Sequence, residues 1–377
     1  MSLNKPSIAL IRGKYSNRYE LQNYSPLSTH VNTMVFSSLL PLDTPHDLPH
    51  IGLLSPADIP MIHRYVKYVC NRSIGDMHLL FGLEHQLEKF DILHTADPYY
   101  YYSYQAAQVK IKFPEKLLIS SVWETIPFNN EATSVKQRLK RFVMNKTDVF
   151  LTYSKKAWKS LIQEEIPASK IHHLSLGIDT ELFIPGSHSS KEILFVGRLV
   201  PEKDPFSVLQ AFVQVLKTHP DYKLRLVGSG PEEKSLREFA TKHKITEHVI
   251  FEKVSYENMP GIYQQADIFV LPSVTTKTWE EQYGMALLEG MSAGLPIVTT
   301  RSGAIGEIVG NAGLYVTEKS STEIAHSLIT LIEDQSLSQK LGTIGRDRAV
   351  KHFNREIFAS KLLKLYETYF SRHTRKK

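Results

Sequence analysis

The 377-residue chain has few of the features that would place it outside a cell or within a membrane. Cys70 is its only cysteine, so no internal disulfide can form, and a reducing compartment such as the cytoplasm is favoured. No stretch approaches the roughly 20 consecutive apolar residues that span a bilayer. Residues 1–6 lack the charged-then-apolar pattern of a signal peptide. We therefore expect a cytoplasmic location, with peripheral contact to the cytoplasmic face of the membrane left open.

Sequence signatures of metal and dinucleotide sites are also missing. The chain contains neither an Asp-x-Asp motif nor a cluster of histidines and cysteines, so we expect no metal and no cofactor. Gly13 follows the first predicted strand, yet the segment lacks the spacing G-x-G-x-x-G, which disfavours a nicotinamide dinucleotide. The net charge of +6 is modest and fits phosphorylated ligands or an anionic membrane surface. We predict no nucleic-acid partner.

The residues that are present are typical of a soluble α/β protein. Hydrophobic residues make up 42% and charged residues 22% of the chain, and this length usually forms about two domains. Apolar, partly β-branched runs alternate with helical patterns such as 57–70 and 133–144, which predicts doubly wound parallel sheets. The predicted strands are residues 7–12, 31–37, 90–94, 116–122, 148–153, 170–176, 192–197, 222–227, 249–254, 268–273 and 297–300.

The most informative stretch runs from residue 267 to residue 303 and reads as strand, loop, helix, tight turn and strand. Gly284 stands where the loop becomes a helix, and the amides and dipole of a helix start suit a phosphate. Glu281 lies in the loop before this helix, and Glu289 lies about two turns into it. This layout fits the sugar, pyrophosphate and ribose of a sugar nucleotide. The glutamate pair alone fits ordinary solvated side chains equally well.

A second candidate site follows the strand 192–197. Gly197 ends that strand, Arg198 comes next and Lys203 lies five residues further on. Two cations at the carboxyl end of a strand can bind a pyrophosphate and offset the charge of a departing nucleoside diphosphate. Taken alone, they are more simply explained as solvated loop residues. The turn 228–231, Gly-Ser-Gly-Pro, ends the next strand.

In the first half of the chain, aromatic residues follow the strand 90–94. His94 ends that strand, and Tyr99 opens a run of four tyrosines. Tyrosine rings can stack on sugars and hydrogen-bond to them, so this segment is a candidate wall of an acceptor or donor-sugar site. In the alternative, Asp97 caps a helix with Pro98 at its first position, and the tyrosines pack between domains.

The segment 135–143 predicts a basic amphipathic helix, with Val135, Leu139, Phe142 and Val143 on one face. Such a helix can lie on an anionic bilayer, where a lipid-linked acceptor would be found. In the alternative, its apolar face packs into the core and its basic side is solvated.

Taken in order, these motifs resemble glycosyltransferase family 4, whose members are retaining enzymes of GT-B fold in the group 1 glycosyl transferases. The resemblance rests on Gly-Ile-Asp at 177–179, Gly197-Arg198 with Lys203, the turn 228–231, and the glutamates flanking Gly284. It implies two Rossmann-like domains facing each other across a cleft. Residues 1–184 would form the acceptor side and residues 191–352 the nucleotide-sugar side, joined by a polar linker at 186–191. A helix at 353–371 would cross back to the first domain.

The resemblance also implies roles for individual residues. Glu281 would contact the donor sugar, Glu289 the ribose, and Arg198 and Lys203 the diphosphate, so Glu281, Arg198 and Lys203 are the predicted catalytic residues. The predicted donor-binding residues are Gly13, Gly197, Arg198, Lys203, Val254, Glu281, Gly284, Met285, Ala286, Leu287 and Glu289. Many members of the family carry a histidine where this chain has Trp123-Glu124. The predicted acceptor-side residues are therefore His94, Tyr99 and Glu124, and a well-placed Glu124 can deprotonate a hydroxyl.

The activity expected from the resemblance is transfer of a sugar from a UDP or GDP sugar to an acceptor hydroxyl, with retention of configuration and without a metal. The acceptor would be a glycan, a lipid-linked sugar or a small molecule. Two alternatives stay open: another GT-B enzyme of sugar nucleotides, such as an epimerase, and a catalytically silent protein that binds sugar nucleotides as a scaffold.

Overall fold

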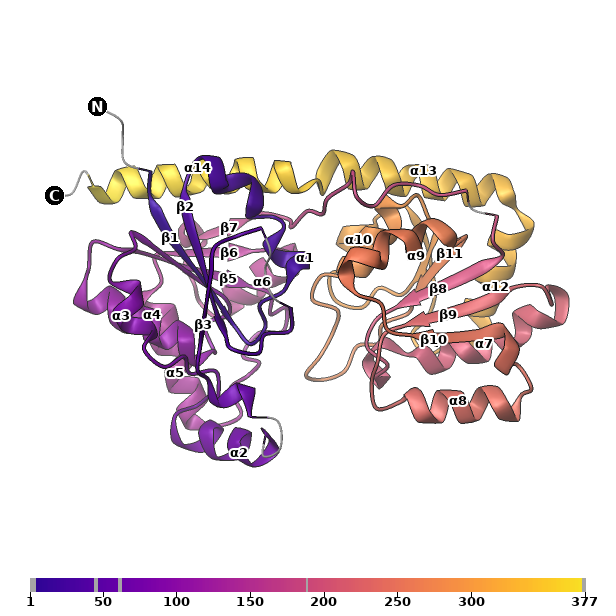
Figure 1. Cartoon of the computed structure of the whole chain (residues 1–377), viewed down its shortest axis with the longest axis horizontal. Helices are drawn as coiled ribbons and strands as arrows, with labels where there is room; N and C mark the ends of the chain where they lie inside the picture. Colours follow the sequence, from indigo (N-terminus) through magenta and orange to yellow (C-terminus); the bar gives the residue numbers. More distant parts are fainter. Residues whose placement is uncertain (1–4, 44–46, 60–62, 188, 375–377) are drawn as a thin grey trace. The chain divides into compact units, whose positions relative to one another are not determined.

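A computed structural model of the chain describes residues 5–43, 47–59, 63–187 and 189–374 (Figure 1). Residues 60–62 of the predicted helix 57–70 and residue 188 of the predicted linker lie outside this set. The chain forms two compact units: Met1–Gly177 with Arg355–Lys377, and Ile178–Asn354. Each unit is built on one parallel sheet with flanking helices, as the alternating pattern predicts.

The first unit contains a seven-stranded sheet in the order β3-β2-β1-β4-β5-β6-β7. Every neighbouring pair in it is parallel. The sheet therefore presents the carboxyl ends of all its strands along one edge. Its strands are β1 (Ser7–Gly13), β2 (Asn32–Ser38), β3 (His50–Leu53), β4 (Ile92–Thr95), β5 (Leu117–Val122), β6 (Val149–Thr152) and β7 (Ile171–His173).

The second unit contains a six-stranded sheet in the order β10-β9-β8-β11-β12-β13. It is parallel throughout as well. The predicted unit of strand, helix and strand around Gly284 is confirmed, because β11 pairs with β12 and α10 lies between them in the chain. Its strands are β8 (Glu192–Val196), β9 (Lys223–Val227), β10 (Val249–Glu252), β11 (Ile268–Leu271), β12 (Ile297–Thr299) and β13 (Gly313–Tyr315).

Helices cover both faces of the first sheet. Side chains alternate between the faces of a strand, so Leu93 enters the core beneath α3, α4 and α5 while His94 points to the other face, where it meets Tyr366 of α14. The helices of this unit are α1 (Arg18–Leu21), α2 (His63–Ser73), α3 (Leu83–Leu87), α4 (Tyr101–Lys112), α5 (Ser134–Lys146), α6 (Lys155–Gln163) and α14 (Arg355–Thr374), with the short 3₁₀ helices η1 (Ser25–Thr29), η2 (Pro56–Asp58) and η3 (Ala168–Lys170).

The second sheet is also covered on both faces, with α7 and α8 on one face and α9 and α10 on the other (Figure 1). Gly290 lets α10 approach β11 closely, since a Cβ there would lie 3.1 Å from the Phe269 ring. The helices of this unit are α7 (Pro205–Thr218), α8 (Glu233–Lys242), α9 (Met259–Gln265), α10 (Met285–Ser292), α11 (Ile305–Val309), α12 (Ser321–Glu333) and α13 (Gln335–His352), with the 3₁₀ helices η4 (Pro201–Lys203), η5 (Thr246–His248) and η6 (Tyr256–Asn258).

The segment that enters the second unit is held there by hydrogen bonds to its backbone. The Ile178 N–H donates to the Phe353 carbonyl at 2.8 Å. The Arg346 guanidinium donates to the carbonyls of Thr180 at 2.7 Å and Phe183 at 2.9 Å. The division between the units therefore falls at Gly177, ahead of the predicted limits at residues 184 and 191.

Helix α5 contains the predicted basic segment 135–143, and its apolar face belongs to the core. Leu139 and Val143 are buried in the cluster beneath the first sheet, and Phe142 packs against Tyr104 with ring centroids 4.9 Å apart. Arg138 and Arg141 are exposed on the other side. The apolar side chains of α5 are thus not available to enter a membrane.

Candidate functional site

The candidate site of the second unit lies at the carboxyl edge of its sheet. The chain leaves β8 to build β9 and β10 on one side, and builds β12 and β13 on the other side of β11. The order of the strands therefore reverses between β8 and β11, and ligands of such sheets bind at this switch point. Arg198 and Lys203 follow β8, and Glu281 follows β11.

Lys203 and Glu281 form a buried ion pair at this switch point. The Lys203 ammonium donates to the Glu281 carboxylate, and the Ser273 hydroxyl donates to the same carboxylate at 2.8 Å. The two paired side chains are only 14% and 9% exposed. The Lys203 ammonium also lies 5.2 Å from the centre of the Trp279 ring. The fold thus brings together a cation and an anion that were predicted separately, 78 residues apart in sequence.

The backbone of Glu281 is fixed by the loop after β12. The Ala304 N–H donates to the Glu281 carbonyl at 2.8 Å, and the Glu281 N–H donates to the Ser302 hydroxyl at 3.3 Å. Gly303 adopts φ +56°, and a Cβ there would lie 1.9 Å from the Glu281 carbonyl oxygen. Only glycine fits such a contact. Sequence reasoning missed this support, because the contact joins two loops.

Gly284 is the N-cap of helix α10. It adopts the left-handed conformation with φ 93° and ψ 51° and leaves the first turn without a side-chain cap. The half-buried Met285 and Ala286 supply the leading amides. The Leu287 N–H donates to the Gly284 carbonyl at 3.0 Å, so it is less available to a ligand than predicted. A helix start of this kind suits an anion.

Glu289 is buried on α10 beside α9. The Tyr263 hydroxyl donates to its carboxylate at 2.8 Å. Burial raises the pKa of Glu289 to about 7, against the opposing effect of hydrogen bonds from Tyr263 and Tyr256. The carboxyl group therefore changes its charge near neutral pH.

The loop that carries Arg198 packs on the glycine turn 228–231. Gly228 adopts φ +145°, and a Cβ there would lie 1.9 Å from the Gly197 carbonyl oxygen. The Leu199 N–H donates to the Ser229 carbonyl at 3.0 Å. Arg198 itself is exposed and makes no ion pair with any described residue. The glycine turn thus positions a cation that is available to a ligand.

Two further predicted donor residues lie at strand ends. Val254 is half-buried just after β10, which β9 separates from β8. In the first unit, Gly13 ends β1 with φ +54°, and a Cβ there would lie 2.7 Å from the Tyr102 ring. That ring explains why glycine occupies the position.

The predicted acceptor-side residue His94 lies in the core of the first unit. His94 is fully buried, with Nδ1 2.6 Å from the Tyr366 hydroxyl and Nε2 2.7 Å from the Ser121 hydroxyl. Burial, and to a lesser extent the charge of Arg12, holds the pKa of His94 well below its usual value. His94 therefore joins β4 and β5 to α14 as a neutral ring.

Glu124 lies at the carboxyl edge of the first sheet, just after β5, and it is buried. Its carboxylate accepts hydrogen bonds from the Ile126 N–H and from the side-chain amides of Asn129 and Asn130, each at 2.9 Å. Burial raises the pKa of Glu124, although these hydrogen bonds act in the opposite direction. Its carboxylate is therefore rigidly held.

Asp97 is a residue that sequence reasoning misplaced. It does not cap a helix, because α4 begins after Tyr100 and the Asp97 carboxylate instead accepts the N–H groups of Trp123 at 3.0 Å and Glu124 at 3.3 Å. Burial and then the neighbouring Glu124 raise the pKa of Asp97 to about 7, while a hydrogen bond from the half-buried Tyr99 lowers it. Two carboxyl groups thus share the edge between β4 and β5. Each stands directly after a strand, which is the signal that could have paired them.

Comparison with known proteins identifies the family of the second unit. Residues 179–348 match the family model of the glycosyl transferases group 1. The second unit is a group 1 glycosyltransferase domain. The chain is 27% identical over 216 residues to the GDP-mannose-dependent alpha-(1-6)-phosphatidylinositol monomannoside mannosyltransferase of Mycolicibacterium smegmatis, a match that covers 53% of this chain and 56% of that protein. The chain spans about half the length of the curated relatives it matches.

Solved structures resemble the whole chain. HepE of Anabaena in complex with UDP matches with a TM-score of 0.75 and 17% identity, over 96% of this chain and 100% of that one. Sucrose-phosphate synthase of Thermosynechococcus elongatus matches with a TM-score of 0.75 and 17% identity, over 97% and 100%. At these identities the likeness shows the fold, which is GT-B, as the sequence predicted.

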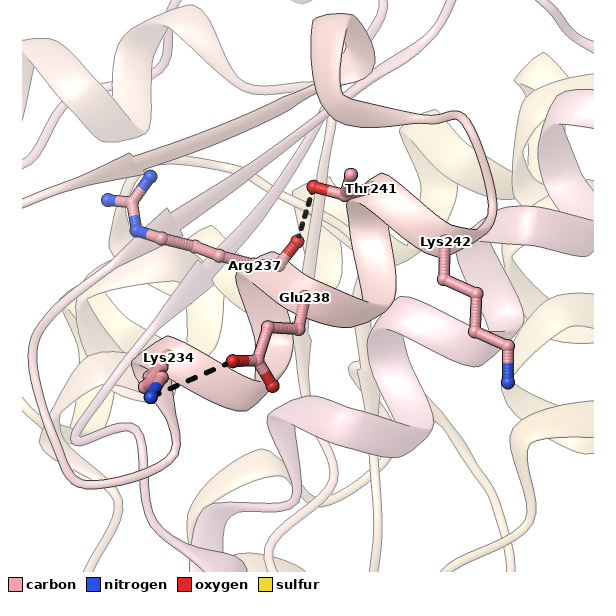
Figure 2. Close-up of a pocket in the computed structure, with 5 residues that line it drawn as sticks. All are labelled: Lys234, Arg237, Glu238, Thr241 and Lys242. Atoms are coloured by element: carbon pink, nitrogen blue, oxygen red, sulfur yellow. Dashed lines mark hydrogen bonds and ion pairs between the residues drawn. The ribbon is translucent and has the colours of Figure 1, made fainter.

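One surface pocket of the group 1 domain lies away from the strand edge. It is lined by residues of α8 alone: Lys234, Arg237, Glu238, Thr241 and Lys242 (Figure 2). Two of the interactions there lie within the helix, since Lys234 pairs with Glu238 at 3.9 Å and the Thr241 hydroxyl donates to the Arg237 carbonyl at 3.0 Å. This pocket has no converging groups for a ligand. In the part of the chain that the structure describes, no helix has both the length and the apolar content to cross a bilayer.

Proposed function

We propose that the protein transfers a sugar from a nucleoside diphosphate sugar to an acceptor hydroxyl, without a metal and with retention of configuration. The observation that supports this most is the buried pair of Lys203 and Glu281 at the switch point of a group 1 domain, beside the start of α10. In the proposed reaction, Lys203 of this pair would contact the phosphates and Glu281 would contact the sugar.

The diphosphate would be held by three kinds of positive group. Lys203 is fixed by its ion pair, Arg198 is exposed at the end of β8, and the leading amides of α10 carry the positive end of the helix dipole. These groups compensate the charge that develops on the departing nucleoside diphosphate. Because protein cations and amides fill this role, we propose a reaction that does not depend on a metal.

The two glutamates would orient the rest of the donor. Glu289 is buried on the same helix, so its carboxylate would accept hydrogen bonds from the ribose hydroxyls. Glu281 is held by Lys203 and Ser273, so it would bind the hydroxyls of the sugar and stabilise positive charge at the reacting carbon rather than attack it. Attack by the acceptor on the same face, through a short-lived ion pair, is the route to retention that agrees with this arrangement.

The acceptor would approach the strand edge of the first unit. Asp97 and Glu124 are the carboxyl groups there, and Tyr99 adds a half-buried ring with a hydroxyl. Glu124 is bound by three donors, so we assign it a positioning role, and Asp97 becomes a second candidate to accept the proton of the hydroxyl. The acceptor would be a sugar or a lipid-linked sugar, and the donor a UDP or GDP sugar.

A test combines donor binding with transfer. UDP-glucose and GDP-mannose are each incubated with the full chain and simple glycoside acceptors, with and without EDTA, and the products are separated by mass spectrometry and NMR. We expect turnover with one donor that survives EDTA and falls at least about a hundredfold in Lys203→Met and Glu281→Gln. Lys234→Met on α8 is the matched control and should retain full activity. Turnover of the donor without an acceptor, or activity unchanged in both site variants, would refute the proposal.

A further inference from the structure

Exposed apolar side chains are concentrated in one part of the first unit. Of the fifteen exposed large hydrophobic side chains among the described residues, nine lie between residues 15 and 81. Six of them follow β2, follow β3 or precede α3, with exposed fractions from 42% for Ile59 to 63% for Leu54. Monomeric soluble proteins rarely expose a large contiguous apolar patch unless it binds something. This set, which we call the apolar ridge, consists of Leu39, Leu40, Leu42, Leu54, Ile59 and Phe81.

Hydrogen bonds fix the segments that carry the apolar ridge. The N–H groups of Leu39 and Leu40 donate to the Asp58 carboxylate at 3.0 Å and 3.3 Å, which ties the loop after β2 to η2. The Phe81 N–H donates to the Leu54 carbonyl at 3.0 Å. The ridge is therefore a fixed feature of the fold.

The apolar ridge borders a pair of cationic helices. Helix α2 packs against η2 and against α5, and the Thr133 hydroxyl at the start of α5 donates to the Asn71 carbonyl of α2 at 3.3 Å. The sequences of α2 and α5 contain no aspartate or glutamate. Of the cations on these helices whose side chains the structure describes, five are exposed: Lys67, Arg72, Arg138, Arg141 and Lys146.

Lys67 on α2 and the half-buried Lys136 on α5 lie close enough for their charges to repel each other. Burial lowers the pKa of Lys136 on α5; Asp76 opposes the shift, and the charge of Lys67 on α2 adds to it. The Arg72 guanidinium stacks over the exposed Tyr68 ring at 3.9 Å, and aromatic residues beside cations are typical of membrane interfaces. The repulsion would be relieved by an anionic surface.

We propose that the apolar ridge and the exposed cations of α2 and α5 dock the protein on an anionic phospholipid bilayer. Leucine and phenylalanine side chains of the ridge enter the boundary between head groups and acyl chains, and the cations contact lipid phosphates. Interfacial binding needs this combination of apolar insertion and positive charge. It differs from insertion of the segment 135–143, since α5 contributes only charge while the loops after β2 and β3 contribute the apolar contact.

The test is co-sedimentation of the full chain with vesicles of phosphatidylcholine, alone or with phosphatidylglycerol. We expect binding to the anionic vesicles only, weakened by salt. Lys67→Gln with Arg72→Gln should lower the partition coefficient about thirtyfold, at about fivefold for each cation. Leu40→Gln with Leu42→Gln should lower it at least about tenfold.

Matched controls remove the same groups elsewhere. Lys234→Gln with Lys242→Gln on α8, and Ile111→Gln with Val350→Gln, change exposed residues outside the two surfaces and should leave vesicle binding unchanged. Circular dichroism checks that each variant is folded. Because vesicle binding is measured without donor, its outcome is independent of the proposed sugar transfer.

Three outcomes would overturn the proposal. The first is wild-type protein that fails to sediment with anionic vesicles, and the second is loss of binding in the control variants equal to that in the site variants. The third is a wild-type dimer in sedimentation velocity that the leucine variant converts to monomers, because a second copy of the chain would then be the occupant of the apolar ridge.

Discussion

The buried carboxyl group of Glu289 makes donor binding depend on pH in a direction that the structure sets. Burial raises its pKa to about 7. A ribose hydroxyl donates its hydrogen bond best to the ionised carboxylate, so the sugar nucleotide should bind preferentially to the protein in which Glu289 is deprotonated. Donor binding should therefore tighten as the pH rises through 7, and binding at pH 6 should release a proton.

The magnitude follows from the fraction of protein that is ionised. With a pKa of about 7, roughly one tenth of the protein carries the Glu289 carboxylate at pH 6 and roughly nine tenths carry it at pH 8. If only the ionised form accepts the ribose, the dissociation constant falls about tenfold between these pH values, or about 1.4 kcal/mol. In Glu289→Gln the side chain has no charge to lose, so this tenfold change should vanish.

Isothermal titration calorimetry with UDP-glucose or GDP-mannose is the appropriate assay, because the phosphates of a nucleotide sugar stay ionised across this range. Titrations at pH 6 in two buffers with different ionisation enthalpies count the protons released. Wild-type dissociation constants that agree within twofold at pH 6 and pH 8, or a Glu289→Gln variant that keeps the full pH dependence, would refute the assignment of Glu289 to the ribose.

Three further predictions concern stability. Lys203→Met leaves the buried Glu281 carboxylate without its cation and should lower the free energy of unfolding in urea by about 3–5 kcal/mol. Adding Glu281→Gln to this variant should restore most of the lost stability. A loss below about 1 kcal/mol in Lys203→Met would contradict a strong buried pair. Gly303→Ala should lower the free energy of unfolding by more than about 2 kcal/mol, because Gly303 has a positive φ and contacts the Glu281 carbonyl. The control Gly261→Ala, with open space around it, should change the free energy of unfolding by less than about 1 kcal/mol. Equal losses of stability in the two variants would contradict this prediction. The pKa of Asp97 is raised to about 7. Its contribution to stability is therefore full below about pH 4 and is lost as the pH rises through 7, by up to about 4 kcal/mol. Asp97→Asn should remove this pH dependence of the free energy of unfolding between pH 4 and pH 8, and an unchanged pH dependence would contradict the assignment.

Local patterns were sufficient to predict much of the fold. Apolar runs such as 268–273 are buried central strands of parallel sheets, and Gly284 begins α10 in the left-handed conformation that favours glycine. The short strand β3 (His50–Leu53) was missed, because all four of its residues are half-buried and one of them is Gly52. The break between α12 and α13 carries no Gly or Pro, and Asp334 caps α13 there.

For the candidate site, the sequence predicted which residues are present but not the contacts that hold them. In the second unit the predicted residues Arg198, Lys203 and Glu281 each stand in a short segment after a strand, and parallel pairing alone brings those segments to one edge. What could not be predicted is how the residues are held, because the support of Glu281 by Gly303 joins loops from two different strands. The motif therefore locates the site, and contacts between loops determine its geometry.

In the first unit the important contacts join residues that are distant in sequence and carry no motif. His94 meets Tyr366, which is 272 residues away, and this contact commits its ring to the core. Asp97 accepts the amides after β5 instead of capping α4. A residue after a strand can face either the ligand edge or a covering helix, and the sequence around it is the same in both cases. The fold's long-range contacts therefore decide which polar groups stand at this strand edge, and we propose Asp97 and Glu124 as the first residues to vary in a test of acceptor specificity.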